Sequence, residues 1–169
     1  AKTLNSFFMV RETTGLLPER FNFAQWKVEG GGAGLHPLRP ELLESCYFLH
    51  RATEGTSVKR SSFQSTDHES DTGESGWLWA ADYSLHAIHR LAWTPCGFAI
   101  IKDVNPSTTG AIPGHNKKSI PKIRTANEMP SFFLSETLKY LFLAFDDDNI
   151  LHNDDDREWV FTTEAHPIH

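Results

Sequence analysis

The chain has 169 residues, a suitable length for one domain with a single sizeable core. Hydrophobic residues make up 39% of the sequence and aromatic residues 12%, which is typical of a folded globular chain. Its 16 Lys and Arg residues are outnumbered by 22 Asp and Glu residues, and the net charge of -6 disfavours binding to DNA or RNA. The longest apolar stretch, residues 131–145, contains Glu136 and Lys139 and is shorter than the roughly 20 residues of a membrane span, so none is predicted.

Apolar residues recur at helical spacing in four segments, and no segment keeps the two-residue alternation of a strand for more than a few positions. The sequence therefore predicts an all-α fold. The first helix is expected over residues 3–12, and residues 16–38, which contain two prolines and a glycine-rich run, are expected to form a long loop. A second helix is expected over residues 40–52, where three apolar positions share one face: Leu42, Cys46 and Leu49.

The middle of the chain alternates between polar and apolar segments. Residues 53–76 and 105–123 are rich in polar residues, Gly or Pro, and both are expected to be solvated insertions. A helix is expected between them, because apolar residues recur with helical spacing at Leu78, Ala81, Leu85, Ile88 and Ala92. Pro95 is expected to end this helix. The segment 96–104 then suits a short strand or hairpin arm.

The last helix is expected over residues 131–145. One face carries Leu134, Leu138, Leu141 and Phe145, and the opposite face carries Phe132, Glu136, Lys139 and Leu143. Because large apolar residues occupy both faces, we expect this helix to be covered on two sides.

Carboxylates provide the first candidates for function. Glu41 and Glu44 project from one face near the start of a helix, where acidic residues either offset the helix dipole or face a cavity. Glu136 follows Phe132 by one turn, and an acid beside an aromatic ring suits sugar binding as well as ordinary packing. The aspartate runs near residues 146 and 154 lack the glycine and closing glutamate of a calcium-binding helix-loop-helix motif.

Histidine and cysteine give weaker signals. His86 and His89 share a helix face as a possible metal pair, but no third ligand is evident. Cys46 and Cys96 have no zinc-site spacing, so one disulfide or two thiols both remain open.

Three longer motifs occur in order along the chain: His36-Pro-Leu-Arg-Pro-Glu-Leu-Leu-Glu-Ser45, the whole segment 131–145, and Phe161-Thr-Thr-Glu-Ala-His-Pro167. Together they resemble glycoside hydrolase family 47, the class I α-1,2-mannosidases. The segments 17–20 and 95–103 resemble the ER degradation-enhancing α-mannosidase-like branch of that family.

The resemblance implies a fold, namely part of an (α/α)7 barrel of helical hairpins with short β segments and long loops. Residues 1–169 would then be the C-terminal part of the catalytic domain, with insertions at 53–76 and 105–123. The family's general acid would lie upstream of Ala1, so the chain alone is not expected to be a competent enzyme.

The resemblance also assigns residue roles. Glu41 matches the general base that activates water, and Thr163 matches the residue that binds Ca²⁺ through its hydroxyl and carbonyl oxygens. The matching substrate-binding residues are Arg39, Glu44, Phe132, Glu136 and Glu164.

The implied activity is removal of α-1,2-linked mannose, with inversion, from N-linked high-mannose glycans. The complete enzyme would act on misfolded glycoproteins in the endoplasmic reticulum lumen, with a protein disulfide isomerase-type oxidoreductase as a candidate partner. Two alternatives are a mannose-glycan-binding module without hydrolytic activity and a helical scaffold without a sugar site.

Overall fold

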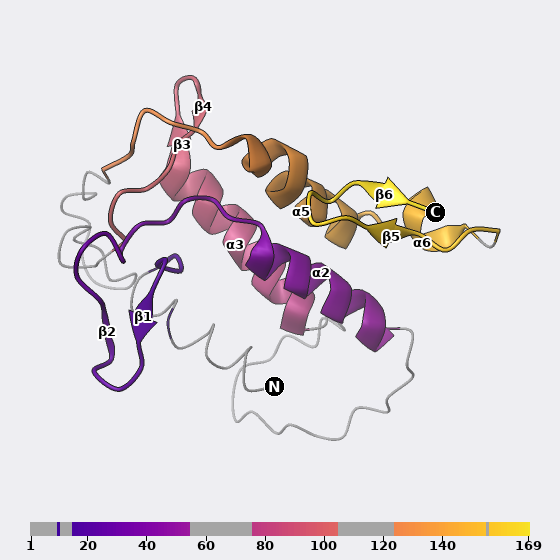
Figure 1. The fold of residues 1–169 in the computed structure, drawn as a ribbon, viewed down its shortest axis with the longest axis horizontal. Coiled ribbons are helices and arrows are strands. Elements are labelled where there is room, and N and C mark those ends of the chain that lie inside the picture. The colour runs from indigo at the N-terminus through magenta and orange to yellow at the C-terminus, as the bar shows by residue number, and fades with distance from the viewer. Residues whose placement is uncertain (1–9, 11–14, 55–75, 105–123, 155) are drawn as a thin grey trace, which may run out of the picture.

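The computed structural model describes residues 10, 15–54, 76–104, 124–154 and 156–169, and helices dominate this part of the chain (Figure 1). The described residues also form three short antiparallel strand pairs: β1-β2 before α2, β3-β4 after α3, and β5-β6 after α6. The elements are β1 (Phe21–Asn22), β2 (Lys27–Val28), α2 (Glu41–Glu54), α3 (Gly76–Ala92), β3 (Trp93–Thr94), β4 (Gly97–Phe98), η1 (Phe133–Thr137), α5 (Leu138–Phe145), α6 (Ile150–Asn153), β5 (Val160–Phe161) and β6 (Pro167–Ile168). No helix in these ranges is both long enough and apolar enough to cross a membrane.

The helix α2 matches the expected second helix, although it begins at Glu41 and continues to Glu54. Pro40 stands just before it, and the Pro40 carbonyl accepts the Glu44 amide at 2.8 Å. The buried stripe is Leu43, Cys46, Tyr47 and His50. The expected stripe was therefore wrong at Leu49, which is 39% exposed, because the apolar face is rotated toward Leu43 and Tyr47.

The helix α3 is present, as the apolar spacing predicted, and it packs against α2 (Figure 1). It ends at Ala92 rather than at Pro95, because Trp93 and Thr94 form β3. Its buried residues are mostly small, which lets the two helix backbones approach closely: Ala80, Ala81, Ser84, Ala87, Ile88 and Ala92. The chain then turns at Pro95 and Cys96 into the β3-β4 hairpin. The expected strand over 96–104 is thus confirmed in its first part.

Ile101 joins two distant segments. It forms isolated bridges with His36 on one side and Thr125 on the other. The His36 amide donates to the Ile101 carbonyl at 2.9 Å, and the Lys102 amide donates to the Arg124 carbonyl at 2.8 Å. The Ile101 segment thus lies between the segment before α2 and the segment that leads into η1.

The helix over residues 131–145 is present, but it contains a π-helical turn, η1, which the sequence did not predict. The Leu138 amide donates to the Phe133 carbonyl, five residues earlier, and the wider turn changes the phase of the side chains that follow. Leu134 and Phe145 are 56% and 44% exposed, so within the described residues only one face of this helix is covered. The residues turned inward are Phe133, Glu136, Thr137, Tyr140, Leu141, Leu143 and Ala144.

Thr137 fixes the π turn to the segment before α2. Its hydroxyl donates to the Leu38 carbonyl at 2.7 Å, and both side chains are fully buried. Leu38 has a φ of 62°, in the left-handed region that a residue with a branched side chain adopts only at a cost. The hydrogen bond therefore holds the chain in a strained conformation immediately before Arg39.

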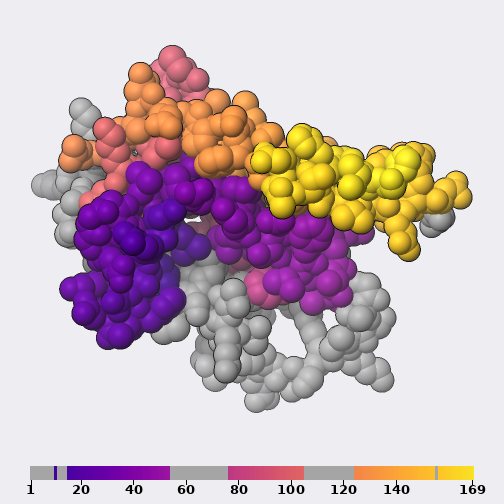
Figure 2. Space-filling model, in the orientation of Figure 1, coloured from indigo at the N-terminus to yellow at the C-terminus, as the bar shows by residue number. Residues whose placement is uncertain are grey.

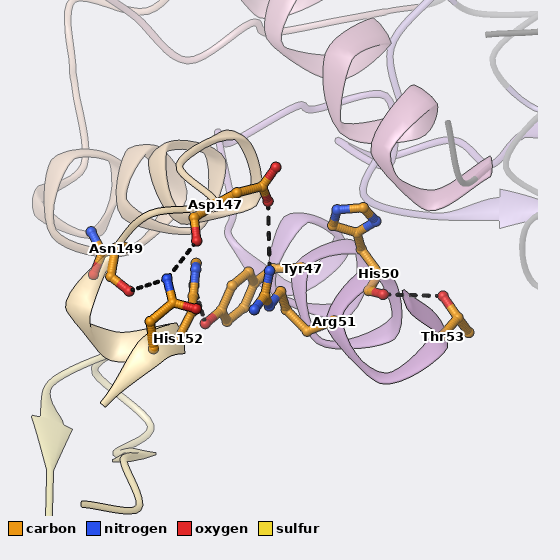
Figure 3. Close-up of polar contacts among 8 residues, drawn as sticks. Tyr47, His50, Arg51, Thr53, Asp147, Asn149 and His152 are labelled. Carbon is orange, nitrogen blue, oxygen red and sulfur yellow. Dashed lines mark hydrogen bonds and ion pairs between the residues drawn. The ribbon is translucent and has the colours of Figure 1, made fainter. Parts of the chain in front are cut away.

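The short helix α6 is tied to the second half of α2 (Figure 3). Tyr47 and His152 are joined through the phenol oxygen and ring Nε2 at 3.0 Å, and Arg51 forms an ion pair with Asp147 at 3.5 Å. Burial lowers the pKa of His152, and the charge of Arg51 lowers it further. The neutral ring thus completes a brace between the two helices.

Three expectations fall wholly or mainly on residues outside the described ranges. Of the helix expected over 3–12, only Val10 is described. The insertions expected over 53–76 and 105–123 likewise lie outside them, except that Thr53 and Glu54 belong to α2 and Gly76 belongs to α3.

The Thr137→Val substitution tests the link to Leu38. We expect it to lower the free energy of unfolding by about 1–3 kcal/mol, because the buried carbonyl loses its donor while the side-chain volume is kept. Urea unfolding measures this change. Ser135→Ala removes an exposed hydroxyl from the same π turn and should change stability by less than about 0.5 kcal/mol. Equal effects of the two changes would contradict the argument.

Candidate active site

The start of α2 carries two glutamates, of which Glu44 contacts α5. Glu41 is the first residue of the helix and is exposed, whereas Glu44 is half-buried one turn later. The Tyr140 hydroxyl donates to Glu44 Oε1 at 3.3 Å. Burial and the neighbouring charge of Glu44 raise the pKa of Tyr140, so the phenol stays protonated and can donate.

Arg39 lies between an acid and an aromatic ring. Its Nε donates to the two carboxylate oxygens of Glu19 at 3.2 and 3.3 Å. Its guanidinium carbon also lies 5.9 Å from the centre of the Phe132 ring. The hydrogen bond with Glu19 raises the pKa of Arg39, which keeps a fixed positive charge beside Glu41.

Thr163 lies at the exposed tip of the turn between β5 and β6. Thr162 closes this turn: its amide donates to the His166 carbonyl at 3.0 Å, and its hydroxyl accepts from the amides of Glu164 and His166. Ala165 is fully buried with a φ of 55°. The backbone of the turn is therefore well defined around Thr163.

Two side chains fix this turn to the helices. Lys139 Nζ donates to the Ala165 carbonyl at 2.7 Å. The ring of Phe161, the last residue of β5, lies about 6 Å from the rings of Tyr47, Phe48 and Tyr140. Figure 1 shows the β5-β6 pair lying alongside α5. The turn thus holds a fixed position relative to α2 and α5.

Glu136 occupies the inner face of the π turn and is only 9% exposed. Burial raises the pKa of its carboxyl group, because water no longer stabilises the charge. Three other carboxylates raise this pKa further, in the order Glu164, Glu41 and Glu44. Each of these three acids therefore lies within electrostatic range of Glu136, although the four residues come from three separate segments.

A pocket of about 220 Å³ opens at the start of α2. Glu19, Arg39 and Glu41 provide its charged groups, and most of its remaining wall is apolar. His36 also lines it: ring Nδ1 donates to the Leu17 carbonyl at 2.8 Å, while buried Nε2 has no partner among the described residues. The other expected site residues do not line this pocket: Glu44, Phe132, Glu136, Thr163 and Glu164.

The structure therefore brings the expected residues into one region but not into one pocket. Arg39 contacts Phe132, and Glu41, Glu44 and Glu164 act electrostatically on Glu136. Sequence reasoning assigned no role to Glu19, Lys139 or Tyr140. The motif at residues 17–20 was the available signal for Glu19, whereas the other two looked like ordinary helix residues.

The remaining candidates stay apart from this region. Cys46 is buried and Cys96 is exposed, and both are free thiols, so they do not pair with each other. Burial raises the pKa of Cys46 to about 11, so it is inert at neutral pH. The ring of His86 contacts Asp82, and that of His89 packs on Trp93, so the two do not form a metal pair.

Carboxylates and the Phe132 ring are groups that can bind a sugar. Residues 70–169, more than half of the sequence, match glycosyl hydrolase family 47, and the chain belongs to that family.

The named relatives are mannosidases or mannosidase-like proteins. The chain is 36% identical over 160 residues to ER degradation-enhancing alpha-mannosidase-like protein 1 of Schizosaccharomyces pombe, covering 95% of this chain and 15% of the relative. It is 33% identical over 161 residues to human mannosyl-oligosaccharide 1,2-alpha-mannosidase IC, covering 94% and 20%. An alpha-1,2-mannosidase structure from Trichoderma reesei matches with a TM-score of 0.53 and 27% identity, over 80% of this chain and 22% of that one. The chain spans about a quarter or less of the curated relatives it matches.

His36 makes stability depend on pH. Burial lowers its pKa below 6.5, so the neutral ring favours the folded state. This contribution is complete above pH 6.5 and is lost as the pH falls toward the lowered pKa. We expect His36→Asn, which keeps a donor for the Leu17 carbonyl, to reduce the loss of stability between pH 7.5 and 5.5, measured by urea unfolding. The exposed His86→Asn variant should keep the full loss.

Proposed function

We propose that this chain is the C-terminal part of the catalytic domain of a calcium-dependent, inverting α-1,2-mannosidase of the ER degradation-enhancing type. The complete protein would release α-1,2-linked mannose from N-linked high-mannose glycans on misfolded glycoproteins. The observation that carries this proposal is the match of residues 70–169 to glycosyl hydrolase family 47. The electrostatic effect of Glu41, Glu44 and Glu164 on the buried Glu136 supports it.

The proposed fold is part of an (α/α)7 barrel. The pair α2 and α3 would be one helical hairpin of it. Leu134, Phe142 and Phe145 leave an apolar face of η1 and α5 exposed, which suits further helices supplied by the rest of a longer protein.

Glu41 is the proposed general base. It lines the pocket, is exposed to water, and lies beside the fixed charge of Arg39. In an inverting glycosidase, the base takes a proton from the water that attacks the anomeric carbon, while a second carboxyl group protonates the departing oxygen. The two groups lie about 6.5–9.5 Å apart, which leaves room for that water. The second group would come from outside this chain.

The sugar-binding residues divide by chemistry. Phe132 offers a ring face for the C–H groups of mannose, and its orientation is fixed by the contact with Arg39. Glu44, held by the Tyr140 hydroxyl, and Glu164 offer acceptors for sugar hydroxyls. The buried Glu136 favours a protonated or cation-compensated state.

The donor set also fits calcium. Thr163 offers a hydroxyl and a carbonyl oxygen at an exposed turn, and the nearby carboxylates can hold bound waters. Within the described ranges, no group of three or more His, Cys, Asp or Glu side chains could hold a metal, so direct coordination would rest on Thr163. A bound Ca²⁺ would supply positive charge for orienting oxygen ligands, of which it takes six to eight.

We place the protein in the endoplasmic reticulum lumen, in line with the named relatives. The exposed Cys96, at the tip of the β3-β4 hairpin, is accessible to a protein disulfide isomerase-type oxidoreductase.

The Glu41→Gln variant of the complete protein tests the assigned base. We expect its kcat for mannose release from a high-mannose glycan to fall by at least 10²-fold, because the amide cannot accept the proton from water. Chromatography of the released sugar measures the rate. Glu29→Gln, an exposed change on the β1-β2 hairpin, serves as the control for loss of one charge. Wild-type turnover by Glu41→Gln would remove the base from the mechanism, and glycan binding without release by the wild type would favour a binding module.

Lys139→Met tests the position of the Thr163 turn. Losing the charged hydrogen bond to the Ala165 carbonyl should weaken Ca²⁺ binding by roughly tenfold, because Thr163 is no longer fixed. Calorimetric titration with CaCl₂ and the Ca²⁺-dependent rise in melting temperature measure this. Lys139→Arg should restore part of the affinity, and Lys102→Met, an exposed change, should not alter it. Unchanged Ca²⁺ affinity in Lys139→Met would show that the turn keeps its position without the contact.

A further inference from the structure

Tyr140 is a buried residue of α5 that contacts two different parts of the candidate site. Its side chain is only 2% exposed. Its hydroxyl donates to Glu44 Oε1 on α2 at 3.3 Å, and its ring centre lies 6.0 Å from that of Phe161 at the end of β5. One side chain therefore touches both α2 and the strand that leads to Thr163.

The hydroxyl of Tyr140 restricts the carboxylate of Glu44. A hydroxyl this deeply buried needs a partner, because an unpaired one loses the hydrogen bonds that water would provide. Glu44 is half-buried, and if it turned toward solvent it would leave the Tyr140 hydroxyl without its acceptor. Within the described ranges, Oε2 of Glu44 has no hydrogen-bond partner, so this oxygen stays available to a ligand.

The ring of Tyr140 belongs to a group of four rings, which we call the ring cluster: Tyr47, Phe48, Tyr140 and Phe161. Their ring centres lie 4.9–6.1 Å apart. Three of the rings come from α2 and α5, and Phe161 comes from β5. Figure 2 shows the surface of the β5-β6 pair lying against the surfaces of α2 and α5. The ring cluster therefore fixes β5, and with it the turn that carries Thr163.

Lys139, the residue before Tyr140, holds the same turn from its other end. Its Nζ donates to the Ala165 carbonyl at 2.7 Å. Thr163 lies between Phe161 and Ala165 in the chain. Two successive residues of α5 thus hold the turn on both sides of Thr163, and the second of them also holds a carboxylate of α2.

We propose that Tyr140 is a positioning residue of the sugar site: its hydroxyl orients Glu44 toward a sugar hydroxyl, and its ring keeps the Thr163 turn in place relative to that carboxylate. Because Tyr140 is almost fully buried, it acts through these two groups and does not touch the glycan. This inference rests on the proposed function and adds to it the residue that holds an acid and the calcium-binding turn in one arrangement.

The Tyr140→Phe variant of the complete protein removes the hydroxyl and keeps the ring. We expect the KM for a high-mannose N-glycan to rise about threefold to tenfold, because Glu44 is no longer held. The kcat should not change, since the hydroxyl contacts Glu44 and not the proposed base Glu41. The affinity for Ca²⁺, measured by calorimetric titration with CaCl₂, should also stay the same, because the ring cluster is intact. A lower kcat with an unchanged KM would contradict the proposal.

Tyr47→Phe provides the matched control. It removes a buried hydroxyl from the same ring cluster, but that hydroxyl contacts His152 instead of Glu44. It should leave the KM for the glycan unchanged. An equal KM in Tyr140→Phe and Tyr47→Phe would overturn the role of the Tyr140 hydroxyl.

Phe161→Leu tests the ring contact, because it removes a ring from the cluster while Glu44 keeps its donor. We expect the affinity for Ca²⁺ to fall about threefold, since the Thr163 turn loses part of its support. Calorimetric titration and the Ca²⁺-dependent rise in melting temperature measure this change. Wild-type affinity for Ca²⁺ in Phe161→Leu would overturn the role of the ring.

A double-mutant cycle separates positioning from a general effect on folding. In the Glu41→Gln protein, calorimetric titration with the glycan should show threefold to tenfold weaker binding when Tyr140→Phe is added. When Glu44→Ala is already present, Tyr140→Phe should cause no further loss, because the carboxylate that it holds is gone. An equal loss in both backgrounds would show that Tyr140 acts only on folding and would overturn the proposal.

The same titrations distinguish this proposal from the proposed function. If the wild type binds the glycan without releasing mannose, and Tyr140→Phe weakens binding only while Glu44 is present, the positioning role holds and the hydrolase proposal fails. If the wild type releases mannose and Tyr140→Phe behaves like Tyr47→Phe, the positioning role fails alone.

Discussion

The hydrogen bond from the Thr137 hydroxyl to the Leu38 carbonyl is the contact on which the candidate site depends. It joins two segments 99 residues apart and lies at the end of a π turn, where the wider backbone turns both Glu136 and Thr137 inward. At its acceptor end the same hydrogen bond holds Leu38 in a left-handed conformation. The helix α2 begins shortly after Leu38, at Glu41. One buried contact thus sets the position of carboxylates on two different helices.

Gathering these carboxylates works against folding. Glu136 is buried, and three further acids act on it, so its ionised form is disfavoured. Lys139 offsets part of this repulsion and at the same time holds the Ala165 carbonyl. A protein keeps such an arrangement where a bound cation or polar ligand compensates it. Leu38 and Ala165 lie on either side of the same region, and their strained φ values also work against folding.

Local sequence patterns predicted α2 and α3 to within a few residues, because apolar spacing and proline act over a few residues of chain. The same reasoning failed at Leu49 and Leu134, which are exposed. Leu134 and Phe145 do share a face at 100° per residue, but that face is exposed, whereas the face with Phe133, Tyr140 and Ala144 is buried. The family motifs correctly identified the family, whereas the roles that they imply for Glu41, Glu136 and Glu164 remain proposals.

By itself, the sequence determined the chemistry available to this protein: carboxylates on helices, a threonine at a turn, and aromatic rings beside them. Only the tertiary structure decided which of them meet. Glu19 pairs with Arg39 across 20 residues, Lys139 with Ala165 across 26, and Tyr140 with Glu44 across 96. No local periodicity encodes such pairs, because they form only when packed helices and a strained backbone bring distant side chains within about 3 Å.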